Sequence, residues 1–142
     1  MKAQILAACL LVPVSALAQE ASGPPDCGLY TYKAEIVRVY DGDTIWADID
    51  LGFNIVLHNE PLRMHRIDTP EVKGEGKERG IEVRDLLAAK LADKEVYICT
   101  VQKKDGQEKK GTFHRYLAEV WVDGENINDW LLSEGYAEPE IR

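Results

Sequence analysis

The first half of the chain consists of short segments with the alternating pattern of β-strands, and this pattern constrains the fold most strongly. Residues 44–51 (TIWADIDL) place apolar side chains such as Ile45 on one face, and Trp46 with two aspartates on the other. A period of two predicts a half-buried strand. Turn residues such as Asp41-Gly42 and Pro70 separate these segments. We expect the strands of this half at residues 30–40, 44–51, 53–57 and 61–68.

Helical periodicity begins only in the second half. Apolar side chains between residues 78 and 92 recur at the spacing of one helix face, and Gly135 is a typical residue for the end of a helix. Five or so short strands with a late helix favour an α+β, mainly β fold, namely a small five-stranded Greek-key barrel of the OB type with two helices. In this half we expect helices at residues 78–92 and 126–134, strands at 95–101 and 113–122, and polar loops at 73–77 and 102–111.

The first eighteen residues have the composition of a secretory signal peptide. Met1-Lys2 gives a positive start, an apolar run follows, and Ala16-Leu17-Ala18 fits the small-residue pattern that precedes a cleavage point. The run is too short to span a bilayer as a stable helix. A lipoprotein cleavage box ending at Cys9 is the competing interpretation, but only five residues precede it. We expect a signal peptide at residues 1–18, a flexible leader at 19–28, one domain at 29–142, and export to the periplasm or the medium.

Two cysteines, Cys27 and Cys99, remain after such a cleavage. An oxidising compartment favours a disulfide between them. The bond would close a loop of about 70 residues, with a nominal stabilisation of ~4 kcal/mol. The alternative is two separate thiols, with Cys99 as a small apolar residue inside a strand.

Charged residues at the predicted strand ends supply the parts of a metal-assisted phosphodiesterase site. Asp43 and Asp68 adjoin turn or small residues, and two carboxylates with a backbone carbonyl form a typical oxygen-rich site for Ca²⁺ or Mg²⁺. Glu71 follows a proline and can reach a water at such a site as a general base. Arg63 and Arg115 can clamp phosphate oxygens bidentately. Each motif alone is an ordinary turn, cap or strand residue, so the inference depends on their joint occurrence.

Three separated motifs, VYDGDT at 39–44, LRMHRIDTPE at 62–71 and FHR at 113–115, resemble the thermonuclease (staphylococcal-nuclease-like) family, over about residues 33–137. The resemblance implies a Ca²⁺-dependent enzyme, with Mg²⁺ or Mn²⁺ less favoured. Such an enzyme hydrolyses DNA and RNA with little sequence preference by in-line attack of water, leaving 3′-phosphate products. The resemblance implies Asp43, Asp68 and the Thr69 carbonyl as calcium ligands, Asp41 as an acid that shapes the metal environment, Glu71 as the residue that activates water, and Arg63 and Arg115 as phosphate ligands.

The sequence departs from the family in two places. Thr112-Phe113-His114-Arg115 replaces the family's Lys-Tyr-Gly-Arg, so a lysine and a tyrosine hydroxyl for terminal-phosphate binding are missing. His114 either replaces part of that contact as a partial cation or is an exposed histidine without a role. Longer members also continue through a base-stacking segment beyond the position of Arg142, and each lost aromatic platform weakens binding by about 1–3 kcal/mol.

The net charge of −8 is unusual for a nucleic-acid binder, because neutralisation of phosphates supplies most of the affinity of such proteins. Basic residues gather in two predicted loops, either as solvated chain or as local guides beside the cleft. We therefore expect weak, salt-sensitive substrate binding. The two basic groups are Lys73/Lys77/Arg79 and Lys103/Lys104/Lys109/Lys110.

Two other functions stay open at this point. One is a catalytically silent OB-type nucleic-acid-binding module, against which the complete set of charged residues argues. The other is a phosphodiesterase for short oligonucleotides, which an acidic surface favours. In each case we expect a monomer without a stable protein partner or a membrane anchor.

Overall fold

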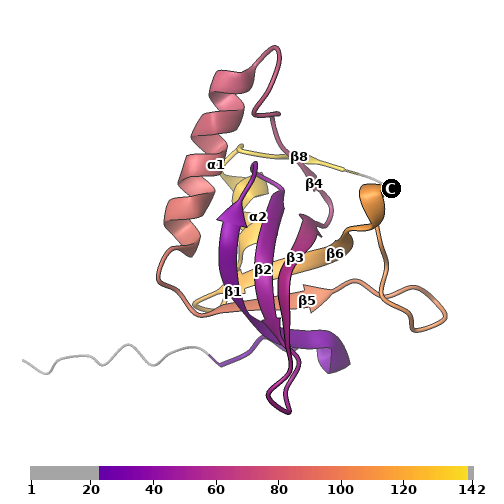
Figure 1. Cartoon of the computed structure of the whole chain (residues 1–142). Coiled ribbons are helices and arrows are strands. Elements are labelled where there is room, and N and C mark those ends of the chain that lie inside the picture. Colours follow the sequence, from indigo (N-terminus) through magenta and orange to yellow (C-terminus); the bar gives the residue numbers. More distant parts are fainter. Residues whose placement is uncertain (1–22, 141–142) are drawn as a thin grey trace, which may run out of the picture.

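Five strands close into a barrel in the computed structural model, which describes residues 23–140 (Figure 1). The strands pair in the order β3-β2-β1-β5-β6, each neighbouring pair antiparallel, and a parallel pairing of β3 with β6 closes the barrel. The predicted mainly β, OB-type barrel is confirmed. Its strands are β1 (Thr31–Val39), β2 (Thr44–Asp50), β3 (Val56–Met64), β5 (Val96–Thr100) and β6 (Tyr116–Val122).

Three two-residue strands complete the sheets. β7 (Glu125–Asn126) extends the barrel sheet beyond β6, whereas β4 (Ile67–Asp68) and β8 (Glu138–Pro139) form a separate antiparallel pair. The β4–β8 pair lies above the barrel in Figure 1 and brings the end of the described chain close to Asp68. This pairing determines which C-terminal residues border the site.

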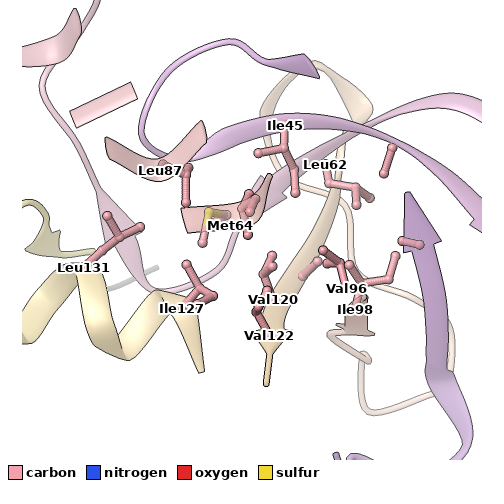
Figure 2. Packing of buried hydrophobic residues seen from close by; sticks show 14 of the residues in the cluster. Ile45, Leu62, Met64, Leu87, Val96, Ile98, Val120, Val122, Ile127 and Leu131 are labelled. Carbon is pink, nitrogen blue, oxygen red and sulfur yellow. The ribbon is translucent and has the colours of Figure 1, made fainter. Parts of the chain in front are cut away.

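Two helices cover the barrel and close its core. α1 (Lys77–Leu91) and α2 (Ile127–Ser133) lie within one residue of their predicted bounds, because both have clear helical periodicity. The Asn126 side chain caps α2 by accepting the N–H of Asp129. Figure 2 shows apolar side chains of both helices meeting those of the barrel strands. The fully buried members include Ile45, Leu62, Met64, Ile67, Val83, Leu87, Val96, Ile98, Val120, Ile127 and Leu131.

The prediction of two strands at residues 53–57 and 61–68 was wrong, because one strand, β3, runs from residue 56 to residue 64, and a turn at residues 65–66 separates it from β4. Phe53 and Asn54 belong to the turn before it, with φ of 52° and 61°. Pro61 does not end the strand, since it pairs with Trp46 of β2 and the pairing with β6 begins only at the next residue. A proline is tolerated where one edge of a strand has no partner.

The predicted strand at residues 113–122 starts later than expected. Residues Thr112–His114 form a 3-10 turn, η2, in which Phe113 and His114 both have φ of 59°. The strand therefore begins at Tyr116, and Arg115 lies at the junction of turn and strand. The backbone of this turn, which apolar periodicity does not reveal, sets the direction of Arg115.

A disulfide links the segment before β1 to the barrel. Cys27 and Cys99 of β5 are joined at an S–S distance of 2.11 Å, with Cα atoms 6.0 Å apart. The predicted signal peptide and residues 19–22 of the leader lie outside the described residues. Neither described helix has the length and apolar character needed to cross a membrane.

Candidate active site

Asp43 is the centre of a buried polar cluster at the start of β2. The residue is only 1% exposed to solvent. One carboxylate oxygen accepts hydrogen bonds from the backbone N–H and the hydroxyl of Thr69, both at 2.9 Å. The other accepts from Arg63 and from the hydroxyl of Thr44 at 3.2 Å. Asp41 holds the turn by accepting the backbone N–H of Asp43 at 3.1 Å.

Arg63 brings three carboxylates together from separate elements. It lies on β3 directly opposite Thr44 of β2, and it is 7% exposed. Its guanidinium forms an ion pair with Asp43, donates to Asp68 at 2.8 Å and lies 3.5 Å from Glu140 beside β8. The two acids predicted as metal ligands therefore converge on one cationic group.

Burial and charge raise the pKa of Asp43 to about 7. Loss of hydration is the largest cause, and the nearby Asp41 carboxylate adds to it, because both disfavour the ionised form of Asp43. Arg63 and the two Thr69 hydrogen bonds act in the opposite direction. The loss of hydration and the charge of Asp41 thus outweigh the stabilisation that Arg63 and Thr69 give to the ionised Asp43 carboxylate.

Two glycines allow α1 to approach the acidic turns. A Cβ on Gly42 would lie 2.6 Å from Cγ1 of Val83 and 2.8 Å from Thr69. A Cβ on Gly80 would lie 2.2 Å from the carbonyl oxygen of Glu71. Sequence reasoning missed both contacts. A glycine inside a predicted helix was the available signal for Gly80, because glycine there costs about 1 kcal/mol relative to alanine.

Arg115 joins the cluster through the Thr44 hydroxyl. Its Nη1 donates to Thr44 Oγ1 at 2.8 Å, and that hydroxyl donates to Asp43 at 3.2 Å. The Arg115 guanidinium also lies 5.6 Å from the ring centroid of Phe113. Thr44 was quoted in the sequence motif without a role, and the structure places it between the acid and the second arginine.

Glu71 and His114 lie outside this hydrogen-bonded cluster. Glu71 is exposed, and within residues 23–140 its carboxylate has no hydrogen-bond or ion-pair partner. It is nevertheless three residues beyond Asp68, on the loop against Gly80. His114 is exposed and borders a surface hollow with Tyr30, Lys103 and Lys110. Glu140, which sequence reasoning missed, reaches the cluster only through the β4–β8 pairing.

The donor set has the chemistry of a hard-cation site. Ca²⁺ and Mg²⁺ prefer oxygen ligands, which Asp43, Asp68 and the backbone of Thr69 offer. Both carboxylates form ion pairs with Arg63, so the two lie close enough to contact the same positive charge. Across residues 23–140, no group of three His, Cys, Asp or Glu side chains is arranged to hold a metal ion. Backbone carbonyls and water would have to complete the coordination, as is common for these ions.

The barrel and the cluster define the class: an OB-type barrel protein whose strand ends carry paired carboxylates and buried arginine. Residues 61–141, more than half of the 142-residue chain, match the family described as staphylococcal nuclease homologue, and the chain belongs to this family. The predicted resemblance is confirmed at the level of the family.

Two relatives give the extent of the similarity. The chain is 33% identical over 121 residues to a protein of Staphylococcus hyicus named thermonuclease, covering 83% of this chain and 64% of that protein. It is 29% identical over 112 residues to an uncharacterized protein of Bacillus anthracis, covering 77% of this chain and 48% of the relative. The chain thus spans less than two thirds of the length of either relative.

Proposed function

We propose that this protein is an exported, calcium-dependent nuclease that hydrolyses phosphodiester bonds of DNA and RNA with little sequence preference. The observation that carries the proposal is the convergence of Asp43 and Asp68 on Arg63, with Arg115 one hydroxyl away. Membership of the nuclease-homologue family and the similarity to a protein named thermonuclease support it. The composition of residues 1–18 supports export.

The two arginines bind and polarise the phosphate. A guanidinium presents parallel N–H donors that match two phosphate oxygens, and such donors stabilise the charge that develops on phosphorus during attack. Among residues 23–140, the contacts of the Arg115 guanidinium are with neutral oxygens and an aromatic ring, so it can turn to a phosphate at little cost. Arg63 must exchange part of its carboxylate contacts for the phosphate.

Glu71 acts as the general base. Its exposed carboxylate takes a proton from a water, and the water oxygen forms a bond to phosphorus in line with the 5′ oxygen. The bond from phosphorus to that 5′ oxygen breaks, and the departing oxygen takes a proton from solvent water, which leaves a 3′-phosphate and a 5′-hydroxyl. The close approach of the Glu71 backbone to Gly80 of α1 supports this role, because it ties the loop that carries the base to the helix.

The residues that would hold calcium are Asp43, Asp68 and the carbonyl of Thr69. When bound, the ion supplies positive charge against the phosphate and makes a nearby water easier to deprotonate. Asp41 orients Asp43 for this task by fixing its backbone N–H.

The test is a nuclease assay on mature protein with Ca²⁺, Mg²⁺ or a chelator, in parallel with Glu71→Gln. We expect wild-type protein to digest DNA and RNA with Ca²⁺ and to stop in chelator, and the variant to be nearly inactive under all conditions. Equal digestion by wild type and variant would contradict the mechanism. Binding of nucleic acid without any digestion would instead indicate a silent binding module.

A second candidate is a phosphodiesterase for short oligonucleotides, which the net charge of −8 favours. A long polyanion is repelled by an acidic surface more than a dinucleotide is. Rates on polymeric DNA and on a dinucleotide, measured at the same concentration of phosphodiester bonds, separate the two. A faster rate on the dinucleotide would favour this candidate over a nuclease.

A further inference from the structure

Two aromatic rings and two cations gather on the outer surface of β1 and β2, next to the acidic turn. The rings of Tyr40 and Trp46 have centroids 5.9 Å apart at an angle of 58°. The Arg38 guanidinium lies 4.1 Å from the Trp46 centroid and 5.8 Å from that of Tyr40. Lys73 Nζ lies 5.7 Å from the Tyr40 centroid. These four residues are called the aromatic–cation platform below.

The platform borders the candidate active site through β2. Side chains two apart on a strand point to the same face, so Trp46 and Thr44 share one face of β2, about 7 Å apart along the strand. Thr44 is the residue whose hydroxyl bonds Arg115. Lys73 follows Glu71 by two residues. The platform is therefore linked to the second arginine through Thr44 and to the loop of the proposed base through Lys73.

Within the described residues, the two cations of the platform form no ion pairs that would stabilise the fold. Four of the six described arginines form ion pairs with carboxylates: Arg63, Arg66, Arg79 and Arg84. Among residues 23–140, no carboxylate lies within ion-pair distance of Arg38, Arg115 or Lys73. In a chain with more acids than bases, the two guanidiniums without ion pairs thus both lie against β2, Arg38 at Trp46 and Arg115 at Thr44.

An arginine lying over an indole presents a flat, cationic outer surface. Unpaired nucleobases stack on aromatic rings and on guanidinium planes, and neighbouring cations attract the backbone phosphates. Arg38 is exposed, and Tyr40 and Trp46 are half-buried, so the platform is open to solvent and backed by the barrel. Bases inside a duplex have both faces covered by neighbouring bases, so this surface suits a single strand.

From these contacts we infer that the platform binds an unpaired nucleobase of single-stranded nucleic acid, adjacent to the phosphate held at Arg115. This inference rests on the proposed nuclease function and adds a preference for single strands. It provides a stacking surface within the described chain, beside β1 and β2, formed by Arg38, Tyr40 and Trp46, residues to which sequence reasoning assigned no role.

The test measures binding in chelator, which keeps hydrolysis out of the measurement. An octathymidylate strand, an abasic octamer of the same charge and an eight-base-pair duplex, each with a terminal dye, are titrated with mature protein, and the fluorescence anisotropy of the dye is the signal. We expect the tightest binding with octathymidylate. Trp46→Thr should weaken that binding roughly 5- to 150-fold, the range measured for loss of one stacking residue. Trp46→Phe should retain most of it, and binding of the abasic octamer should change little.

Arg38→Gln and Lys90→Gln form a matched pair. Each removes one cation from above a tryptophan ring, since Lys90 lies 4.9 Å from the Trp130 centroid on α2. We expect Arg38→Gln to weaken octathymidylate binding several-fold and Lys90→Gln to leave it unchanged. Urea unfolding of each variant shows whether the fold is intact, and Arg38→Gln keeps the test valid if Trp46→Thr does not fold.

Two results would overturn the platform: octathymidylate and the abasic octamer binding equally well, or Trp46→Thr and Arg38→Gln both binding octathymidylate as tightly as Lys90→Gln does. The proposed function fails in a different way. If wild-type protein does not digest nucleic acid with Ca²⁺ but binds octathymidylate in a Trp46-dependent manner, the platform stands and the catalytic proposal fails. Digestion with binding that is independent of Trp46 overturns the platform alone.

Discussion

The buried cluster around Asp43 and the basic loop at residues 102–111 hold their charges in different ways. In the cluster, Asp43, Arg63 and Thr69 are each less than 8% exposed and are joined by several hydrogen bonds. In the loop, three of the four lysines are exposed, and Asp105 and Glu108 lie between them. Charges in a low-dielectric surrounding interact strongly, whereas exposed charges are screened by water and salt.

The difference separates two tasks that a phosphodiesterase must perform. The cluster can stabilise charge in a fixed geometry, which is what a chemical step requires. The loop can only raise the local concentration of a polyanion, and it does so in a salt-dependent way. Substitutions in the cluster and beside it should therefore change turnover or stability, and substitutions in the loop should change apparent affinity.

The largest effect is expected for Glu71→Gln, which keeps the shape of the side chain and removes the base. Loss of a general base lowers kcat by about 10²- to 10⁴-fold. The free energy of unfolding should stay the same, because the exposed carboxylate has no partner in the described part of the chain. Steady-state kinetics and urea unfolding measure the two quantities.

Glu75→Gln is the matched control, because Glu75 is also exposed and lies on the same loop. It should leave kcat within about twofold of the wild-type value, since it only removes a screened surface charge. An equal loss in both variants would mean that the charge of the loop, and not a base at residue 71, determines the rate.

Arg63→Met tests the buried cluster through its effect on the free energy of unfolding. It leaves Asp43 buried without its cation, and breaking a buried ion pair costs about 3–5 kcal/mol. The double variant Asp43→Asn/Arg63→Met should recover part of that loss, because no uncompensated charge remains. Urea midpoints measure both, and a single variant as stable as wild type would show that the cluster is hydrated in solution.

The parts of the fold with strong local periodicity could be predicted from the sequence. Both helices and strands β1, β2 and β5 lie close to their expected bounds, because alternation and helical spacing are local properties. The single strand β3 and the late start of β6 were missed. A proline in an edge position and two left-handed residues in η2 depend on which strands lie next to them.

The candidate site also has parts that could be predicted from the sequence and parts that could not. The identities of Asp43, Asp68 and Arg63 came from motifs, and the structure brings these three together. The contacts around these residues could not be predicted from the motifs. The hydrogen bond from Arg115 to Thr44 and the approach of Glu140 to Arg63 both depend on pairings between distant strands. The periodicity of a strand indicates which of its faces is buried, but not which strand lies next to it.

Gly80→Ala tests whether the buried cluster and the exposed Glu71 loop depend on one packing contact. A Cβ at this position would lie 2.2 Å from the Glu71 carbonyl, so α1 or the loop must move. Overpacking of this kind costs about 1–3 kcal/mol. We expect kcat to fall as well, because the displaced loop carries the base.

Ala89→Gly is the control for this substitution. Ala89 is exposed on α1, and glycine there costs about 1 kcal/mol through helix propensity alone. It should lower stability by a similar amount without changing kcat. If Gly80→Ala lowers stability and leaves kcat intact, the Glu71 loop is positioned independently of α1.

The smallest effect per residue is expected in the basic loop. Replacement of Lys103, Lys104, Lys109 and Lys110 by glutamine should raise KM several-fold at low salt and leave kcat unchanged, because the cluster is not altered. The slope of log affinity against log salt should become shallower by about 0.7 for each lysine that contacts a phosphate of a single strand. Binding titrations between low and physiological salt, in chelator, give this slope.

If the fourfold variant lowers kcat or leaves the slope unchanged, the division of tasks between buried cluster and exposed loop is wrong. In the first case the loop takes part in the chemical step, and in the second the strand follows another path, for which the surface beside Arg38 is the alternative.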